Sequence, residues 1–184
     1  MKLQLISCPA SVAGRLLAGF FLLLGTLVFA ATENVDQVLQ HADQIKYIHN
    51  DEYLAILKRL DAQSDSLTGL QRDWLAYFHA WQLGYAGEYE KALGAFQALL
   101  AHTQDPTIRA RSRISLIYDQ VNAARLDDAY STMSDLLASQ SQVEDHNTHF
   151  LILTTAAYLY GSAGQYDLAL SYVDQMLAYD GSDR

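Results

Sequence analysis

The sequence is short of residues on which several kinds of function depend. Among its 184 residues there is one cysteine, Cys8, so the chain cannot form an internal disulfide. Lys and Arg number 12 against 21 Asp and Glu, which gives a formal net charge of −9. Binding to nucleic acids and attachment to anionic membranes both depend on basic residues. The charge balance therefore argues against both kinds of partner.

Proline is also scarce, and beyond the first 30 residues only Pro106 occurs. Helix-forming residues dominate from about residue 33 onward, and no stretch alternates apolar and polar residues as a strand does. We therefore predict an all-α fold with eight helices arranged as four antiparallel pairs. Helix starts are predicted at Asn50-Asp51, at Ser66 or Thr68, and at Asp105-Pro106; helix ends are predicted at Gly87, Gly161, Gly164 and Gly181.

No catalytic motif occurs in the sequence. It has no glycine-rich phosphate loop, no His-Glu-x-x-His and no nucleophile elbow. The segment DHNTH (145–149) places His146 and His149 three residues apart, and a solvated loop with a partly buried His149 is favoured there over a metal site. His79 is expected to be a hydrogen-bonded core residue. We predict that the chain is not an enzyme and uses neither a cofactor nor a metal.

The one long hydrophobic run, LLAGFFLLLGTLVFA, covers residues 16–30. It ends with small residues at Val28 and Ala30, the −3 and −1 positions that signal peptidase prefers. Residues 1–30 are therefore predicted to be a signal peptide cleaved after Ala30, which leaves 31–184 periplasmic or secreted. A spanning helix needs about 20 apolar residues, and a retained anchor with the chain facing the periplasm is the alternative.

Three segments of the chain are similar to one another: AGEYEKALGAF (86–96), AARLDDAYSTM (123–133) and AGQYDLALSYV (163–173). Aligned on Ala92, Ala129 and Ala169, the copies lie 37 and 40 residues apart. The tetratricopeptide repeat has a period of about 34 residues. A spacing this regular indicates a repeated helix–turn–helix unit.

Each equivalent position in these copies has an expected structural role. Gly87 and Gly164 take the positive φ of the turn, and the alanines allow the two helices to cross closely. In the middle copy Ala124 replaces this glycine, so Asn122 is the expected left-handed residue there. Below the turn we expect Tyr89, Leu126 and Tyr166 to fill the space, with Phe96, Met133 and Val173 in the next layer.

With these motifs, residues 70–180 resemble the tetratricopeptide-repeat family. The resemblance implies a right-handed superhelical array of about four antiparallel helix pairs, a solenoid whose concave groove is lined by the first helix of each pair. The middle copy departs from the family pattern at Ala124 and at Ile117, which stands where a small residue is expected. The pair at 33–62 fits the spacing poorly and is expected to be a related helical hairpin.

An aromatic stripe follows the segment WLAYFHAWQLGY (74–85), within an arc of about 80° on a helix. The opposite side of this helix, with Ala76, Ala80 and Leu83, is expected to face the core. Together with the equivalent positions of later pairs, the candidate groove residues are Trp74, Tyr77, Trp81, Tyr85, Arg111, Tyr118, Asn122 and Tyr158.

Two interpretations of this stripe remain open. Aromatic rings with one arginine suit an extended peptide or a small ligand with a carboxylate. Alternatively, the rings pack against the preceding hairpin at 33–62. If they line a groove, Trp74→Ala and Arg111→Ala should weaken partner binding and leave the melting temperature nearly unchanged. A large loss of stability would instead mark Trp74 as a core residue.

Residues 33–180 also resemble a narrower group, on the segments LTGLQRDWLAYFHAWQLGYAGEYEKAL, DPTIRARSRISLIYDQVNAARLDDAYSTMSDLL and GQYDLALSYVDQML. They look like the extracytoplasmic sensor region of bacterial GGDEF-type diguanylate cyclases. In that family a signal sequence and the repeats precede a membrane span and the cyclase domain; no GGDEF string occurs in this chain.

The resemblance implies a non-catalytic sensor module that recognises a protein, peptide or small ligand of unknown identity. The alternative is a structural scaffold that organises complexes of the cell envelope. The chain ends in YDGSDR, with no polar element to cover the last repeat. We therefore expect a fragment of a longer protein, in contact with the membrane only through an anchor or a downstream span, or a dimer formed through the last helix.

Overall fold

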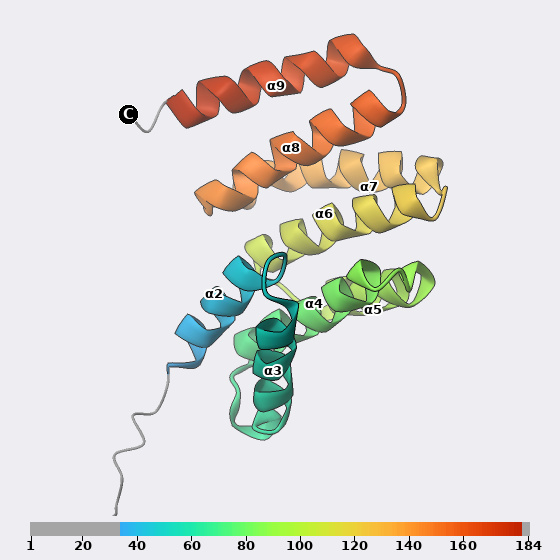
Figure 1. The fold of residues 1–184 in the computed structure, drawn as a ribbon. Helices are drawn as coiled ribbons and strands as arrows, with labels where there is room; N and C mark the ends of the chain where they lie inside the picture. The colour runs from blue at the N-terminus through green and yellow to red at the C-terminus, as the bar shows by residue number, and fades with distance from the viewer. Residues whose placement is uncertain (1–33, 182–184) are drawn as a thin grey trace, which may run out of the picture. The chain divides into compact units, whose positions relative to one another are not determined.

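The structure is a computed structural model that describes residues 34–181, so the predicted signal peptide at 1–30 lies outside the described residues. Within the described range the chain forms eight α-helices and no strand, which confirms the all-α prediction (Figure 1). The helices are α2 (Val35–Ile45), α3 (Asn50–Asp61), α4 (Gly69–Tyr85), α5 (Tyr89–His102), α6 (Pro106–Asn122), α7 (Leu126–Ser139), α8 (His146–Ser162) and α9 (Tyr166–Gly181). None of these helices is long and apolar enough to cross a membrane.

Neighbouring helices pack as the pairs α2–α3, α4–α5, α6–α7 and α8–α9 (Figure 1). The contacts between one pair and the next follow a regular pattern. The first helices contact one another in the order α2, α4, α6, α8, and each second helix contacts the first helix of the following pair. Side chains of the first helices are therefore brought together from segments far apart in the sequence.

The helices begin where local signals predict them. The Thr68 hydroxyl accepts a hydrogen bond from the Gln71 amide at 3.3 Å, and the Gln71 side chain accepts one from the Thr68 amide at 3.0 Å. This reciprocal arrangement is a capping box, so α4 begins after Thr68 and not after Ser66. At α6 the Asp105 carboxylate accepts from the Ile108 amide at 2.8 Å, ahead of a proline at the first helical position.

The turn inside each of the last three pairs has the same geometry. Gly87, Ala124 and Gly164 adopt positive φ values of 80°, 59° and 76°. At each turn the next residue donates its amide proton to a carbonyl five positions back, at 2.8–2.9 Å. This pattern is the Schellman motif that ends helices. The expectation that Asn122 is the left-handed residue was wrong: Asn122 ends α6 and Ala124 takes the position that glycine occupies in the other copies.

Replacing Ala124 by glycine should stabilise the protein. A left-handed conformation costs a non-glycine residue roughly 1–2 kcal/mol, and glycine loses part of this gain through the freedom it adds to the unfolded chain. We expect Ala124→Gly to raise the free energy of unfolding by about 0.5–1 kcal/mol, measured by urea denaturation. Gly87→Ala is the matched control and should be destabilising. An added Cβ at position 87 would meet no atom within 4 Å, so the loss of stability would come only from the positive φ that alanine must adopt. A loss of stability in Ala124→Gly would contradict the prediction.

Several repeat positions are buried as expected. Ala92, Ala129, Phe96 and Met133 are fully buried, and Tyr89 is half-buried. Ala169 is half-buried beside α8. A Cβ added at Gly161 of α8 would lie 3.7 Å from the Cβ of Ala169. The α8–α9 crossing is therefore close enough to favour small residues on both sides.

Other repeat positions are exposed, contrary to expectation. Leu126 is 42% exposed, Tyr166 69% and Val173 37%. Leu126 and Tyr166 are the first residues of α7 and α9, and unlike Tyr89 at the start of α5 they do not fill the space beneath the turn. Val173 lies on α9, which among the described helices packs chiefly against α8. Ile117, in contrast, is fully buried at the position where a small residue was expected.

The face of α4 opposite the stripe also differs in part from the prediction. Ala80 is fully buried and Leu83 half-buried, but Ala76 is exposed, so the packed face is narrower than the repeat pattern implies. His79 is not a core residue. It lies exposed, and its Nε2 is 2.8 Å from the carboxylate of Asp61 at the end of α3.

Candidate functional site

A cavity of about 700 Å³ opens between the end of α2 and the helices α4, α6 and α8. Six of the eight candidate groove residues line it: Tyr77, Trp81, Tyr85, Arg111, Tyr118 and Asn122. They come from α4 and α6, which contact each other and so bring these residues to one wall. Ligand pockets commonly have volumes of about 300–1,000 Å³ and combine apolar walls with a few polar groups. This cavity has that size and that composition.

The aromatic stripe of α4 is partly packed inside the protein and partly exposed at the cavity. Tyr77 and Trp81 are buried, with exposed fractions of 3% and 8%, whereas Tyr85 is 55% exposed. The Trp81 ring stacks on Tyr85 at 5.0 Å between centroids and meets the edge of Tyr47 at the same distance. The first part of the stripe therefore packs against the α2–α3 pair, and its last residue reaches the cavity mouth.

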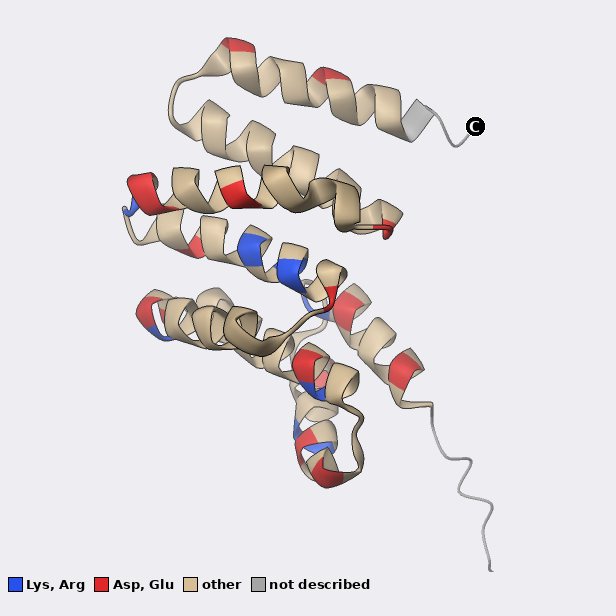
Figure 2. Ribbon diagram, turned by 180° about the vertical axis from the view of Figure 1, so that it is seen from behind, with Lys and Arg blue, Asp and Glu red and all other residues tan. Residues whose placement is uncertain are grey.

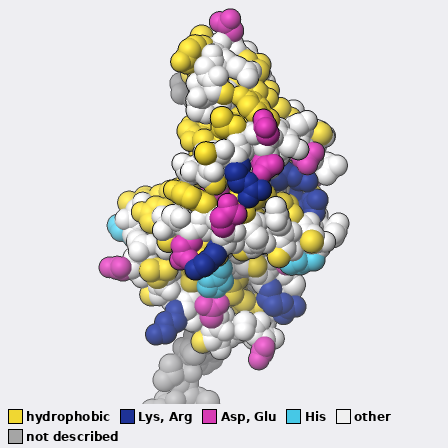
Figure 3. Space-filling model, turned by 90° about the vertical axis from the view of Figure 1, so that its right-hand side faces the viewer, with side chains coloured by type: hydrophobic (Ala, Val, Ile, Leu, Met, Phe, Trp, Pro, Cys, Tyr) yellow, Lys and Arg dark blue, Asp and Glu magenta, His cyan; other side chains and the backbone are white. Residues whose placement is uncertain are grey.

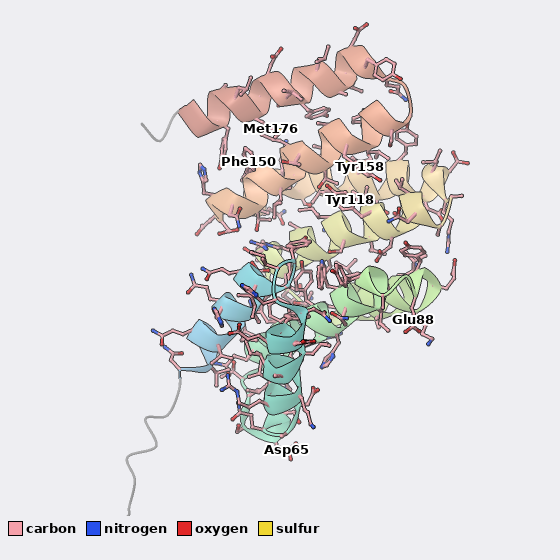
Figure 4. All side chains as sticks on the ribbon, in the orientation of Figure 1. Asp65, Glu88, Tyr118, Phe150, Tyr158 and Met176 are labelled. Carbon is pink, nitrogen blue, oxygen red and sulfur yellow. The ribbon has the colours of Figure 1, made fainter. Side chains whose placement is uncertain are left out.

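Trp74 and Tyr158 lie outside this cavity. Trp74 is half-buried against Tyr77 and Phe78, and with Arg111 it lines a second cavity of about 310 Å³. Tyr158, from α8, lies beside Tyr118 of α6 with 4.7 Å between ring centroids (Figure 4). Burial raises the pKa of Tyr118. The two tyrosines extend the aromatic wall from α6 onto α8.

Lys46, just after α2, is a buried cation beside the cavity. Only 3% of its side chain is exposed, and its Nζ donates hydrogen bonds to Asp43 at 2.6 Å and to the Tyr77 hydroxyl at 3.1 Å. The ammonium also lies 5.1–5.9 Å from the centroids of four aromatic rings, those of Tyr47, Tyr77, Phe78 and Trp81. Aromatic faces attract cations at such distances. The charge of Lys46 is thus compensated within the protein.

Arg111, from α6, connects three helix pairs. Its guanidinium donates to Asp43 of α2 at 2.7 Å and to the Thr148 hydroxyl of α8 at 2.8 Å, and it lies 3.5 Å from Asp145. Asp145 caps α8 by accepting from the Thr148 amide at 2.7 Å. Because Arg111 is 6% exposed and its carboxylate partners belong to the chain itself, it is not free to bind a ligand carboxylate.

The electrostatics of this network are mutually supporting. Burial alone would lower the pKa of Lys46 and of Arg111, but the nearby Asp43 and Tyr77 outweigh it and raise both. Burial would raise the pKa of Asp145, but hydrogen bonds from Thr148 and the charge of Arg111 lower it. All three groups are therefore held in their charged forms.

Asp119, one residue after Tyr118, is a second carboxylate on the cavity wall. It is 7% exposed, and burial raises its pKa to about 7. The carboxylate lies against the backbone of Gly84 in α4, where a Cβ would be 2.4 Å from its Oδ1. Glycine at position 84 is thus what allows Asp119 to sit between α6 and α4.

Sequence reasoning missed the residues that make this cavity polar. Asp43, Lys46 and Tyr47 belong to the pair that does not follow the repeat spacing, so no equivalent position pointed to them. Asp119 did leave a signal, since LIYDQVN places an acid next to the candidate groove residue Tyr118 within an amphipathic helix.

In the described part of the chain, no group of three His, Cys, Asp or Glu side chains could hold a metal. His146 and His149 stack instead on the Tyr179 ring, at 4.4 and 5.7 Å.

Charge is unevenly distributed along the array. Arg125 is the last basic residue before Arg184, so α7, α8 and α9 have no Lys or Arg, while α7 and α9 carry acidic residues (Figure 2). Arg111 and Lys46, beside the cavity, lie in the half that holds the basic residues.

Comparison with known proteins gave no match: no protein-family model, no curated protein and no solved structure matches this chain.

Proposed function

We propose that this chain is a non-catalytic binding module that takes a small ligand, or one side chain of a peptide, into the cavity between α2, α4, α6 and α8. The observation that carries the proposal is the cavity itself. Its wall combines exposed aromatic rings, such as Tyr85, with polar groups that include Asn122 and Asp119. The sequence offers no catalytic motif that would favour an enzyme over this function.

The helix array is proposed to be a right-handed superhelix of the tetratricopeptide kind. The repeated contact pattern between pairs and the three identical turns at Gly87, Ala124 and Gly164 support this arrangement. In such an array the first helices line the concave side, which agrees with the origin of the cavity-lining residues. The cavity would then be the deepest part of a longer groove.

The cellular role is proposed from the sequence. An exported module of this type suits the periplasmic sensory region of a GGDEF-type signalling protein, and the apolar run at 16–30 supports export. This role predicts that the reading frame containing residue 184 continues into a membrane span and a GGDEF domain. Sequencing that frame tests it, and a stop codon directly after Arg184 would contradict it.

Binding is tested by thermal unfolding of the full chain against a panel of amines, amino acids, sugars, carboxylates and short peptides. A ligand at 100 times its Kd stabilises the folded state by about 2.7 kcal/mol, which for this size corresponds to a rise in Tm of roughly 5–10 °C. Tyr85→Ala should reduce the rise. Leu126→Ala is the control, since Leu126 is also exposed (42%) but lies on α7, outside the cavity. A panel without any binder, or a rise unchanged by Tyr85→Ala, would contradict the proposal.

A structural scaffold is the second candidate function, and the outer face of α9 favours it. Tyr166, Leu170, Val173 and Leu177 recur at spacings of four, three and four residues and are 37–70% exposed. Hydrophobic side chains are prominent toward the end of the molecule that holds α8 and α9 (Figure 3). Such spacing forms one apolar seam along a helix. A seam of this kind is self-complementary, so the proposed partner is α9 of a second copy.

The dimer predicts a change of mass with concentration. In sedimentation equilibrium the full chain should shift from monomer toward dimer, and Leu170→Lys with Leu177→Lys should keep it monomeric, because two charges would be buried in the seam. Leu54→Lys, on α3 and 40% exposed, is the control and should leave association unchanged. A wild-type chain that stays monomeric throughout would rule this contact out.

A further inference from the structure

Asp119 is the only carboxylate on the main cavity wall for which the described part of the chain supplies no partner. Two carboxylates line this cavity, Asp43 and Asp119. Asp43 binds both Lys46 and Arg111, whereas no hydrogen bond or ion pair of the Asp119 carboxylate is found among residues 34–181. Yet Asp119 is more than nine-tenths buried. Burying a carboxylate without a partner is costly, so an unpaired one in a cavity points to a partner from outside the chain.

The basic residues that line the cavity cannot supply this partner in their present positions. The Lys46 ammonium is held by Asp43, by the Tyr77 hydroxyl and by four aromatic rings. The Arg111 guanidinium is divided between Asp43, Thr148 and Asp145. Both are therefore compensated by other groups, and the Asp119 carboxyl group is the ionisable group of the wall that they leave without a partner.

The rings around Asp119 fit the same kind of partner. Tyr118 precedes it on α6, and Trp81 and Tyr85, three residues before and one residue after Gly84 on α4, line the same cavity. Tyr85 and Tyr47 are 55% and 67% exposed, so their rings are accessible at the cavity mouth. Faces of Trp and Tyr attract cations, and they bind an organic cation through its apolar part as well.

We propose that the cavity binds a small organic ammonium compound whose charged nitrogen pairs with the Asp119 carboxylate and whose apolar part lies against Tyr85 and Tyr118. This inference rests on the proposed binding function and assigns its ligand class. The role of Arg111 differs from the one expected from the sequence: it positions α2 and α8 around the cavity, and the ligand contact is made by the acid. The net charge of −9 acts in the same direction, because it attracts cations from solution.

The test uses three probes of similar shape with the full chain: 2-phenylethylammonium, neutral 2-phenylethanol and anionic 3-phenylpropanoate. Binding is followed by calorimetry and by the fluorescence of Trp81 and Trp74. The ammonium should bind most tightly, and D119N should weaken it at least about tenfold, as expected for loss of a charged hydrogen bond. The affinity for 2-phenylethanol should stay the same in D119N.

A second variant separates the ring contact from the charge. Tyr85→Phe should keep the affinity for 2-phenylethylammonium, whereas Tyr85→Ala should lower it. Equal binding of the ammonium to wild type and D119N, or binding of the alcohol as tightly as the ammonium, would overturn the inference. If the neutral or anionic probe binds and Tyr85→Ala weakens it, the binding function stands and only the ligand class is wrong. Failure of all three probes also overturns the inference, while the wider ligand panel decides the binding function separately.

Discussion

Replacing Arg111 by alanine is expected to lower the free energy of unfolding by about 3–5 kcal/mol. The guanidinium is 6% exposed and pairs with Asp43 at 2.7 Å, with Asp145 at 3.5 Å and with the Thr148 hydroxyl at 2.8 Å. Its removal leaves two carboxylates near each other without their shared cation. For a domain of this size the loss corresponds to a fall in Tm of roughly 6–20 °C. Urea denaturation of the full chain measures it.

Arg113 provides the matched control for this prediction. It lies two residues further along α6, is half-buried and makes no ion pair in the described part of the chain. Arg113→Ala should cost less than about 1 kcal/mol. A double mutant of Arg111 and Asp43 should lose less than the sum of the two single mutants, because both single changes remove the same ion pair. Similar losses for Arg111→Ala and Arg113→Ala would show that the network contributes little.

The second large effect concerns Asp119→Asn, which should stabilise the protein at pH 8 by about 1–4 kcal/mol and have little effect at pH 4. The folded-state pKa of Asp119 is raised from 3.8 to about 7. Between these values the folded chain keeps a proton that the unfolded chain has lost. The stability due to this group is therefore present below pH 3.8 and disappears as the pH rises to 7. Asparagine removes this dependence, since it does not ionise.

Free energies of unfolding at pH 4, 6 and 8 test this prediction for wild type and variant. The advantage of Asp119→Asn should grow with each step. Asp174→Asn, an exposed acid on α9, is the control and should change stability by less than about 0.5 kcal/mol at all three pH values. An advantage that is the same at pH 4 and pH 8 would mean that Asp119 stays charged in the folded state over that range.

Much of the fold was predictable because its signals are local. Thr68 with Gln71, and Asp105 with Pro106, specify helix starts through side chains that bond amides three residues away. Gly87 and Gly164 mark turns because they adopt positive φ. Ala124 departs from this rule, because it adopts the same positive φ although it is not a glycine. Burial at the turns was less predictable, as it depends on which helix comes next.

The site was predictable only where the repeat places residues at equivalent positions. Six candidate groove residues on α4 and α6 line one cavity for this reason. The bond between Arg111 and Asp43 joins residues 68 positions apart, and one partner lies in the irregular first pair, so no periodicity could reveal it. The missing partner of Asp119 is likewise a property of the folded surroundings. It depends on Gly84, from another helix, leaving room for the carboxylate.

The cavity has a mechanical consequence that follows from how it is built. Its walls come from α2, α4, α6 and α8, so they belong to all four helix pairs rather than to one rigid unit. Any hinge motion between neighbouring pairs must widen or narrow this space. A bound molecule that touches several walls would restrain bending between neighbouring helix pairs. Binding at the cavity would therefore change the motions of the first and last helix pairs as well.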